Sequence, residues 1–92
     1  MPVVCRFKFP EGTDGETIET HLAFAVISAE CTFGKPGVRT SGAAYFLSKE
    51  RPQMTIDVST EVGEHIAKVF AGLMIRELGE EGFTVERMVG GS

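Results

Sequence analysis

Two segments of the chain share one residue pattern at a constant separation of forty-eight positions. The matching positions are Gly15-Glu16-x-Ile18 with Gly63-Glu64-x-Ile66, Leu22 with Phe70, and Val26 with Met74. Such a repeat is typical of a duplicated supersecondary unit, in which each copy presents the same apolar face to a shared core. We therefore expect two similar halves, joined in one domain over residues 1–92.

The second copy of the repeat has the spacing of an amphipathic helix from Glu61 to Leu78, followed by glycines that stop it. The first copy has two interpretations, because residues 16–32 also alternate like a strand and contain β-branched side chains. The repeat favours a helix there. That helix would begin near Asp14, after the capping-box pattern Thr13-x-x-Glu16, and end at Gly34. A strand instead would give a β-rich meander.

Four other segments show the two-residue alternation of half-buried strands. They are Val3–Phe9, Val38–Leu47, Met54–Val58 and Phe83–Val89. The middle two are separated by a polar turn and predict a hairpin. Together, the elements predict an α+β fold with a duplicated β-α-β order (β-α-β-β-α-β), right-handed crossovers, and two helices on one face of a four-stranded sheet.

The alternation also assigns side chains to the two faces of the predicted sheet. The residues expected to meet the helices are Val3, Cys5, Phe7, Phe9, Met54, Ile56, Val58, Phe83 and Val85. The opposite face is polar and carries Pro2, Val4, Arg6, Lys8, Thr55, Asp57, Ser59, Thr84, Glu86 and Met88. Arg6 and Lys8 are expected to pair with Asp57 and Glu86, on a face that is either solvated, buried in an oligomer, or a binding site.

Charge and hydropathy exclude several classes of protein. Thirteen acidic against nine basic residues give a net charge of −4, which argues against nucleic-acid binding. The longest apolar run, Leu22 to Ile27, is too short to span a bilayer, and a cytoplasmic protein without a membrane partner is expected. A chain this short buries only about 60 to 65% of its unfolded surface, so self-association is expected.

The cysteines and histidines do not suggest a cofactor or a metal. Cys5 and Cys31 have neither CxxC nor metal-clip spacing, and both are interpreted as packed, buried thiols. His21 and His65 fall on the polar sides of their helices and are interpreted as solvated. Glu61 lies four residues before His65, but two ligands do not make a metal site.

Two short proline-containing motifs lie next to the predicted strands and helices. Met1-Pro2 directly precedes the first strand, which ends in Phe9-Pro10, and Gly34-Lys35-Pro36 lies between the first helix and the second strand. With the repeated β-α-β order, they resemble the tautomerase superfamily over most of the chain. The resemblance is to the macrophage migration inhibitory factor branch above all, and to the 4-oxalocrotonate tautomerases.

The resemblance implies keto/enol isomerisation of a small carbonyl acid, with Pro2 as the catalytic base. Removal of Met1 would expose a secondary amine whose pKa an apolar or cationic setting lowers toward neutrality. If Met1 is retained, that nitrogen is an amide and cannot act as a base.

The resemblance also assigns substrate-binding residues. Lys35 would contact the carboxylate or carbonyl oxygen of the substrate, Arg39 would line the pocket, and Ser59 would contribute backbone near the proline. Thr84 and Glu86 would reach in from an adjacent subunit of a homotrimer. The inhibitory-factor branch has Tyr and Asn on that strand, and Glu86 would repel an acidic substrate.

The chief alternative is a non-catalytic ferredoxin-like module that oligomerises through its sheet and binds a small ligand or a partner protein. An interaction or scaffold protein is a further alternative. This topology hosts many unrelated functions, so the predicted fold does not decide between them.

Overall fold

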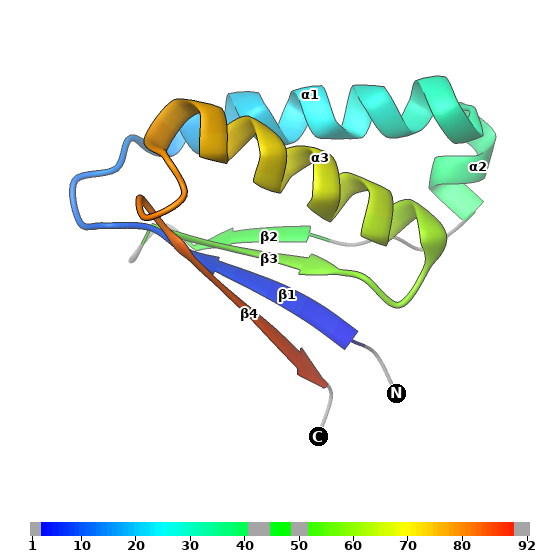
Figure 1. Cartoon of the computed structure of the whole chain (residues 1–92). Helices are drawn as coiled ribbons and strands as arrows, with labels where there is room; N and C mark the ends of the chain where they lie inside the picture. Colours follow the sequence, from blue (N-terminus) through cyan, green and yellow to red (C-terminus); the bar gives the residue numbers. More distant parts are fainter. Residues whose placement is uncertain (1–2, 41–44, 49–51, 90–92) are drawn as a thin grey trace.

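Two long helices cover one face of a four-stranded antiparallel sheet (Figure 1). The structure is a computed structural model that describes residues 3–40, 45–48 and 52–89. Its elements are β1 (Val3–Lys8), α1 (Gly15–Phe33), α2 (Lys35–Thr40), β2 (Tyr45–Ser48), β3 (Gln53–Asp57), α3 (Glu61–Leu78) and β4 (Thr84–Val89). The predicted α+β class is confirmed.

The strand order in the sheet is β2-β3-β1-β4. The β2–β3 hairpin and the adjacency of β1 to both β3 and β4 agree with the sequence prediction. The two strands that α1 connects, β1 and β2, are separated by β3, and the two that α3 connects, β3 and β4, are separated by β1. Each pair of helix-connected strands therefore has one strand of the other pair inserted between its members.

The ambiguous segment over residues 16–32 is helical. Asp14 is the N-cap of α1 and accepts a hydrogen bond from the backbone N–H of Glu16 at 3.1 Å. Thr13 was expected to be the cap, but its hydroxyl instead donates to the carbonyl of Pro10 at 2.7 Å. The buried residues of α1 recur at intervals of three and four, and they are Ile18, Leu22, Ala25 and Ala29.

The second strand is much shorter than the sequence predicts. Residues 38–40, expected to be extended, form the last part of α2, and residues 41–44 lie outside the described part of the chain. The physical reason lies at the end of α1. Gly34 adopts a φ of 81°, which glycine tolerates because it has no Cβ, and the chain turns there. Pro36 then fits the first turn of a new helix, because an N–H there would have no partner within the helix.

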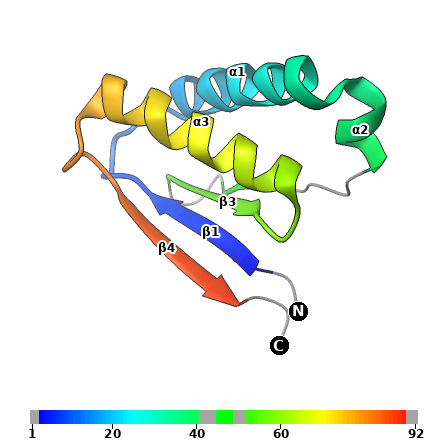
Figure 2. The same cartoon turned by 45° about the vertical axis from the view of Figure 1, so that its right-hand side comes forward.

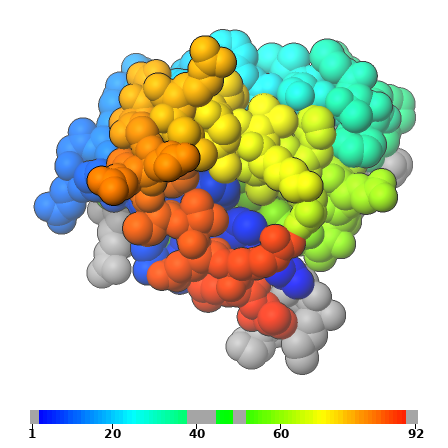
Figure 3. Space-filling view, in the orientation of Figure 1, coloured from blue at the N-terminus to red at the C-terminus, as the bar shows by residue number. Residues whose placement is uncertain are grey.

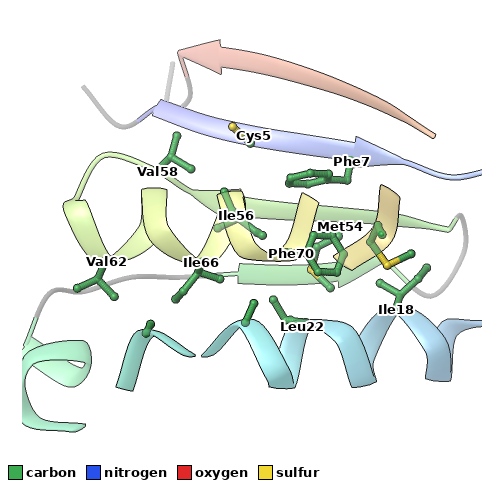
Figure 4. Packing of buried hydrophobic residues seen from close by; sticks show 14 of the residues in the cluster. Cys5, Phe7, Ile18, Leu22, Met54, Ile56, Val58, Val62, Ile66 and Phe70 are labelled. Atoms are coloured by element: carbon green, nitrogen blue, oxygen red, sulfur yellow. The ribbon is translucent and has the colours of Figure 1, made fainter. Parts of the chain in front are cut away.

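The core lies between the sheet and the two long helices, as Figure 4 shows. Phe7 of β1 and Phe70 of α3 meet edge to face, with ring centroids 5.0 Å apart. Phe9 packs on the same Phe70 ring at 6.2 Å. The core residues are Cys5, Phe7, Phe9, Ile18, Leu22, Ala25, Ala29, Met54, Ile56, Val58, Val62, Ile66, Ala67, Phe70 and Met74.

The edge strand β4 is the part of the sheet that the helices cover least. Figure 2 shows β4 outside the layer of α1 and α3, and in the space-filling view β1 is visible between α3 and β4 (Figure 3). Val85 was expected in the core, but its side chain is 48% exposed for this reason. Val3 and Phe83 are only partly buried.

None of the helices in the described ranges is long and apolar enough to cross a lipid bilayer.

The close approach of α3 to β3 depends on a glycine. A Cβ on Gly63 would overlap the backbone carbonyl oxygen of Asp57. We expect Gly63→Ala to lower the free energy of unfolding by about 2–3 kcal/mol, because the helix must move away from the sheet. Urea denaturation measures this change.

Gly72→Ala is the matched control for that substitution, since Gly72 lies in the same helix and a Cβ there meets no atom within 4 Å. It should raise stability by about 0.5–1 kcal/mol through helix propensity. Equal effects of the two substitutions would contradict the close-packing explanation.

Candidate functional site

An apolar groove of about 510 Å³ runs between α1 and β2. Its walls combine one side of the helix with the edge strand of the sheet. The residues that line it are Glu19, Leu22, Ala23, Val26, Ile27, Tyr45, Phe46 and Leu47. A concave, mostly apolar cavity with few polar groups is the usual form of a site for a small molecule.

The groove exists because α1 is apolar on more than its core-facing side. Leu22 points into the core, whereas Ala23 and Ile27 lie further round the helix, and Ile27 is 52% exposed. On the strand, Tyr45 pairs with Ile56 and therefore shares the helix-facing side of the sheet. Tyr45 is nevertheless 51% exposed, so β2 and α1 do not close on each other.

The polar atoms of this groove belong to two side chains among its described lining residues. Glu19 supplies a carboxylate, and Tyr45 supplies a phenolic hydroxyl. A carboxylate at the edge of an apolar groove favours a ligand group that is basic or donates a hydrogen bond.

The sequence pattern does not predict this groove, although it contains a signal for it. Residues 16–32 were ambiguous because they carry apolar residues at both helical and alternating spacing. In the structure, the additional apolar residues, Ala23 and Ile27, are the ones that line the groove. The signal was that residues 16–32 contain more apolar residues than the core-facing side of one helix needs.

The residues predicted from the tautomerase resemblance are spread over several elements. Pro2 lies outside the described residues. Lys35 is exposed at the start of α2, and Arg39 lies in the same helix. Lys35 is not among the described residues that line the cleft containing Ser59.

Ser59 follows β3 and is bonded to Asp57. The backbone N–H of Ser59 donates to Asp57 Oδ1 at 2.9 Å, and its hydroxyl donates to the same oxygen at 2.5 Å. These bonds to the ionised form lower the pKa of the Asp57 carboxyl below its ordinary value. Asp57 therefore bonds to Ser59, and the predicted pairing with Arg6 is absent from the described contacts.

A second cleft, of about 460 Å³, lies where β3 leads into α3. It is lined by Phe33, Val58, Ser59, Thr60, Glu61, Glu64, His65 and Lys68. The backbone N–H of Val58 donates to the carbonyl of Val3 at 2.8 Å, so the start of β1 lies beside this cleft. Lys35 lies at the same end of the molecule, two residues after Phe33 (Figure 1).

Thr84 and Glu86 lie away from that cleft within one copy of the chain. Thr84 pairs with Lys8, at the opposite end of β1 from Val3. Glu86 forms the predicted cross-strand ion pair with Lys8, at 3.1 Å, while Arg6 Nε is buried without a hydrogen-bond partner among the described residues.

The two histidines lie between the helices, and their interpretation as solvated residues is wrong. His65 Nε2 is 3.0 Å from the hydroxyl oxygen of Ser28, which links α3 to α1. His21 Nδ1 is 2.7 Å from the carbonyl oxygen of Thr17, and its Nε2 is 3.8 Å from a carboxylate oxygen of Glu77 on α3. Both rings reach across because α1 and α3 lie side by side (Figure 1).

The two cysteines differ in burial. Cys5 is buried, and desolvation raises the pKa of its thiol. Cys31 is exposed, so the prediction that both thiols are buried is wrong for this residue. It lies on the side of α1 opposite Leu22 and Ala29, which points away from the core.

An ion pair joins β4 to α3 on the helix-facing side of the sheet. The Arg87 guanidinium donates a hydrogen bond to Glu64 and lowers the pKa of that carboxyl. In the parts of the chain that the structure describes, no group of three or more His, Cys, Asp or Glu side chains could hold a metal ion.

No protein-family model matches the chain, and no curated protein matches it significantly.

The Ser59–Asp57 contact predicts a pH-dependent contribution to stability. Because the folded-state pKa of Asp57 is lowered, the contribution is present above the ordinary value of 3.8 and is lost as the pH falls through the folded-state value. Ser59→Ala should lower stability by about 1 kcal/mol or less near neutral pH, since the pair is close to solvent, and by less in strong acid. Urea denaturation across this pH range measures the difference.

Asp57→Asn provides the control background. In that variant, the effect of Ser59→Ala should be smaller and independent of pH. A pH-independent loss in the wild-type background would contradict the assignment.

Proposed function

We propose that this chain is a non-catalytic, ferredoxin-like ligand-binding module, and that its ligand site is the groove between α1 and β2. The interleaved strand order β2-β3-β1-β4 supports the topology, because a strand inserted between two helix-connected strands is the split β-α-β arrangement of ferredoxin-like domains. The groove itself carries the functional proposal, since its volume of about 510 Å³ and its apolar walls suit a small molecule.

The ligand would be a small, largely apolar molecule with a basic or hydrogen-bond-donating group. Its apolar part would lie against Ala23, Val26 and Ile27, and its polar group would reach Glu19. Ala23 has a small side chain and leaves space at the middle of the helical wall.

The composition of the groove supports binding over catalysis. Its described lining residues contain a single carboxylate and a phenol, without a neighbouring histidine, cysteine or lysine to form an acid–base or nucleophile–base pair. The Ser28–His65 contact lies on the other side of α1, between the helices.

Filling the groove should weaken ligand binding. Ala23→Trp is expected to weaken the binding of the neutral dye Nile red at least about tenfold, because the indole would occupy the cavity. Dye fluorescence during titration with protein measures the affinity. Thr20→Trp is the matched control, since Thr20 is exposed on the same helix and does not line the groove. Equal loss in both variants would contradict the assignment.

Glu19 should select for positively charged ligands. We expect decylamine to displace Nile red more effectively than decanoate by up to about fivefold, the upper end of the range for a solvent-exposed ion pair. Glu19→Gln should remove this preference without loss of dye binding. An unchanged preference in Glu19→Gln would exclude Glu19 as the charge-selective group.

The second candidate function is the tautomerase activity that the sequence resemblance implies. One observation favours it, namely that the Val58–Val3 hydrogen bond brings the start of β1 beside the 460 Å³ cleft that Ser59, His65 and Lys68 line. Pro2 would then act as the base near this cleft, with Lys35 and Arg39 from α2 at the same end. Thr84 and Glu86 would have to come from a neighbouring subunit of a cytoplasmic homotrimer.

Intact mass and one substitution test this second candidate. If the native protein has lost Met1, Pro2→Ala should abolish phenylpyruvate ketonisation, whereas Pro10→Ala, in the exposed loop after β1, should leave the rate unchanged. Retention of Met1, or equal rates in wild type and Pro2→Ala, would exclude Pro2 as the base.

A further inference from the structure

The two edge strands of the sheet differ in how they are protected. β4 carries Glu86 and Arg87, which form ion pairs with Lys8 and Glu64, and charges of this kind discourage pairing with another chain. β2, at the other edge, has the sequence Tyr-Phe-Leu-Ser and no charged residue. An uncharged, apolar edge strand is a template for strand addition.

Exposed apolar side chains continue from β2 onto α1. Phe46 is 68% exposed and Tyr45 is 51% exposed on the strand, and Ile27 is 52% exposed on the helix. All three line the groove, with Tyr45 on the helix-facing side of the sheet and Phe46 on the opposite side, so the apolar surface continues round the edge of β2. Contiguous apolar patches on small proteins commonly mark an interface.

We propose that β2 pairs antiparallel with β2 of a second copy about a two-fold axis, and that this second copy closes the open side of each groove. The closure rests on the proposed ligand-binding function, whereas the strand pairing does not. Self-pairing needs the same strand and the same apolar patch on both partners, which is the condition for a two-fold interface. It joins two four-stranded sheets into one continuous antiparallel sheet.

The register of β2 indicates what the second copy adds. Residues opposite one another on paired strands share a face, so Tyr45 of the second copy lies on the helix side of the joined sheet. It then lies on the side of the joined sheet that carries the groove of the first copy. Phe46 lies on the opposite face, opposite Thr55 in register, where the apolar side chains of the two copies cover one another.

The mass of the assembly in solution tests the strand pairing. Light scattering at micromolar concentrations should give twice the chain mass of 10.0 kDa. Phe46→Lys places a charge on the β2 edge and should give a monomer, because edge lysines oppose strand addition. Val85→Lys is the matched control on β4, where Val85 is 48% exposed, and it should remain a dimer.

A monomeric or trimeric wild type would overturn the proposal, as would a Phe46→Lys variant that stays dimeric. Hydrogen exchange gives a second readout, because β2 amides should exchange faster when the wild type is diluted to monomer.

Dilution of the wild type also tests closure of the groove without changing its lining. Nile red should bind each chain at least about fivefold more weakly below the dimer dissociation constant than above it. Equal affinity in monomer and dimer would show that one copy completes the site. A dimer without dye binding would overturn the proposed function and leave the strand pairing intact.

Discussion

The contact between Phe7 and Phe70 is the interaction on which the rest of the structure depends. The rings meet edge to face at 5.0 Å and join the central strand β1 to α3 across the core. Gly63, about two turns before Phe70 on the same face of α3, lets the start of that helix approach the backbone of Asp57. With α3 held at both places, α1 packs beside it, and this contact sets the position of α1.

This placement of α3 and α1 determines which surfaces stay open. The two helices cover the middle of the sheet, so the helix-facing side of β4 stays partly open and is joined to α3 by the Arg87–Glu64 ion pair. On the other side, α1 carries more apolar surface than the core takes up. Ile27 and Tyr45 consequently remain half exposed and form the groove. The groove thus arises where the apolar surface of α1 exceeds what one core can bury.

Much of the fold followed from local pattern. Alternation in β1 placed Cys5 and Phe7 toward the helices and Arg6 away from them, and pairing of β1 with β3 and β4 matches that prediction. The pattern failed at Gly34-Lys35-Pro36, where a positive φ and a proline in a first helical turn start a new helix. The groove was harder to predict from the sequence than the fold. Tyr45 and Ile27 belong to different elements, and the sequence did not indicate that these two elements lie side by side.

The sequence by itself determined the α+β class, the helix over Glu61–Leu78 and most of the inward-facing residues, because these depend on periods of two and 3.6 residues that a chain carries locally. Only the tertiary structure decided the placement of His21 and His65 between two helices and the formation of the apolar groove. Each of these depends on which distant segments come into contact. Periodicity assigns a residue to a face but does not specify which element lies opposite it.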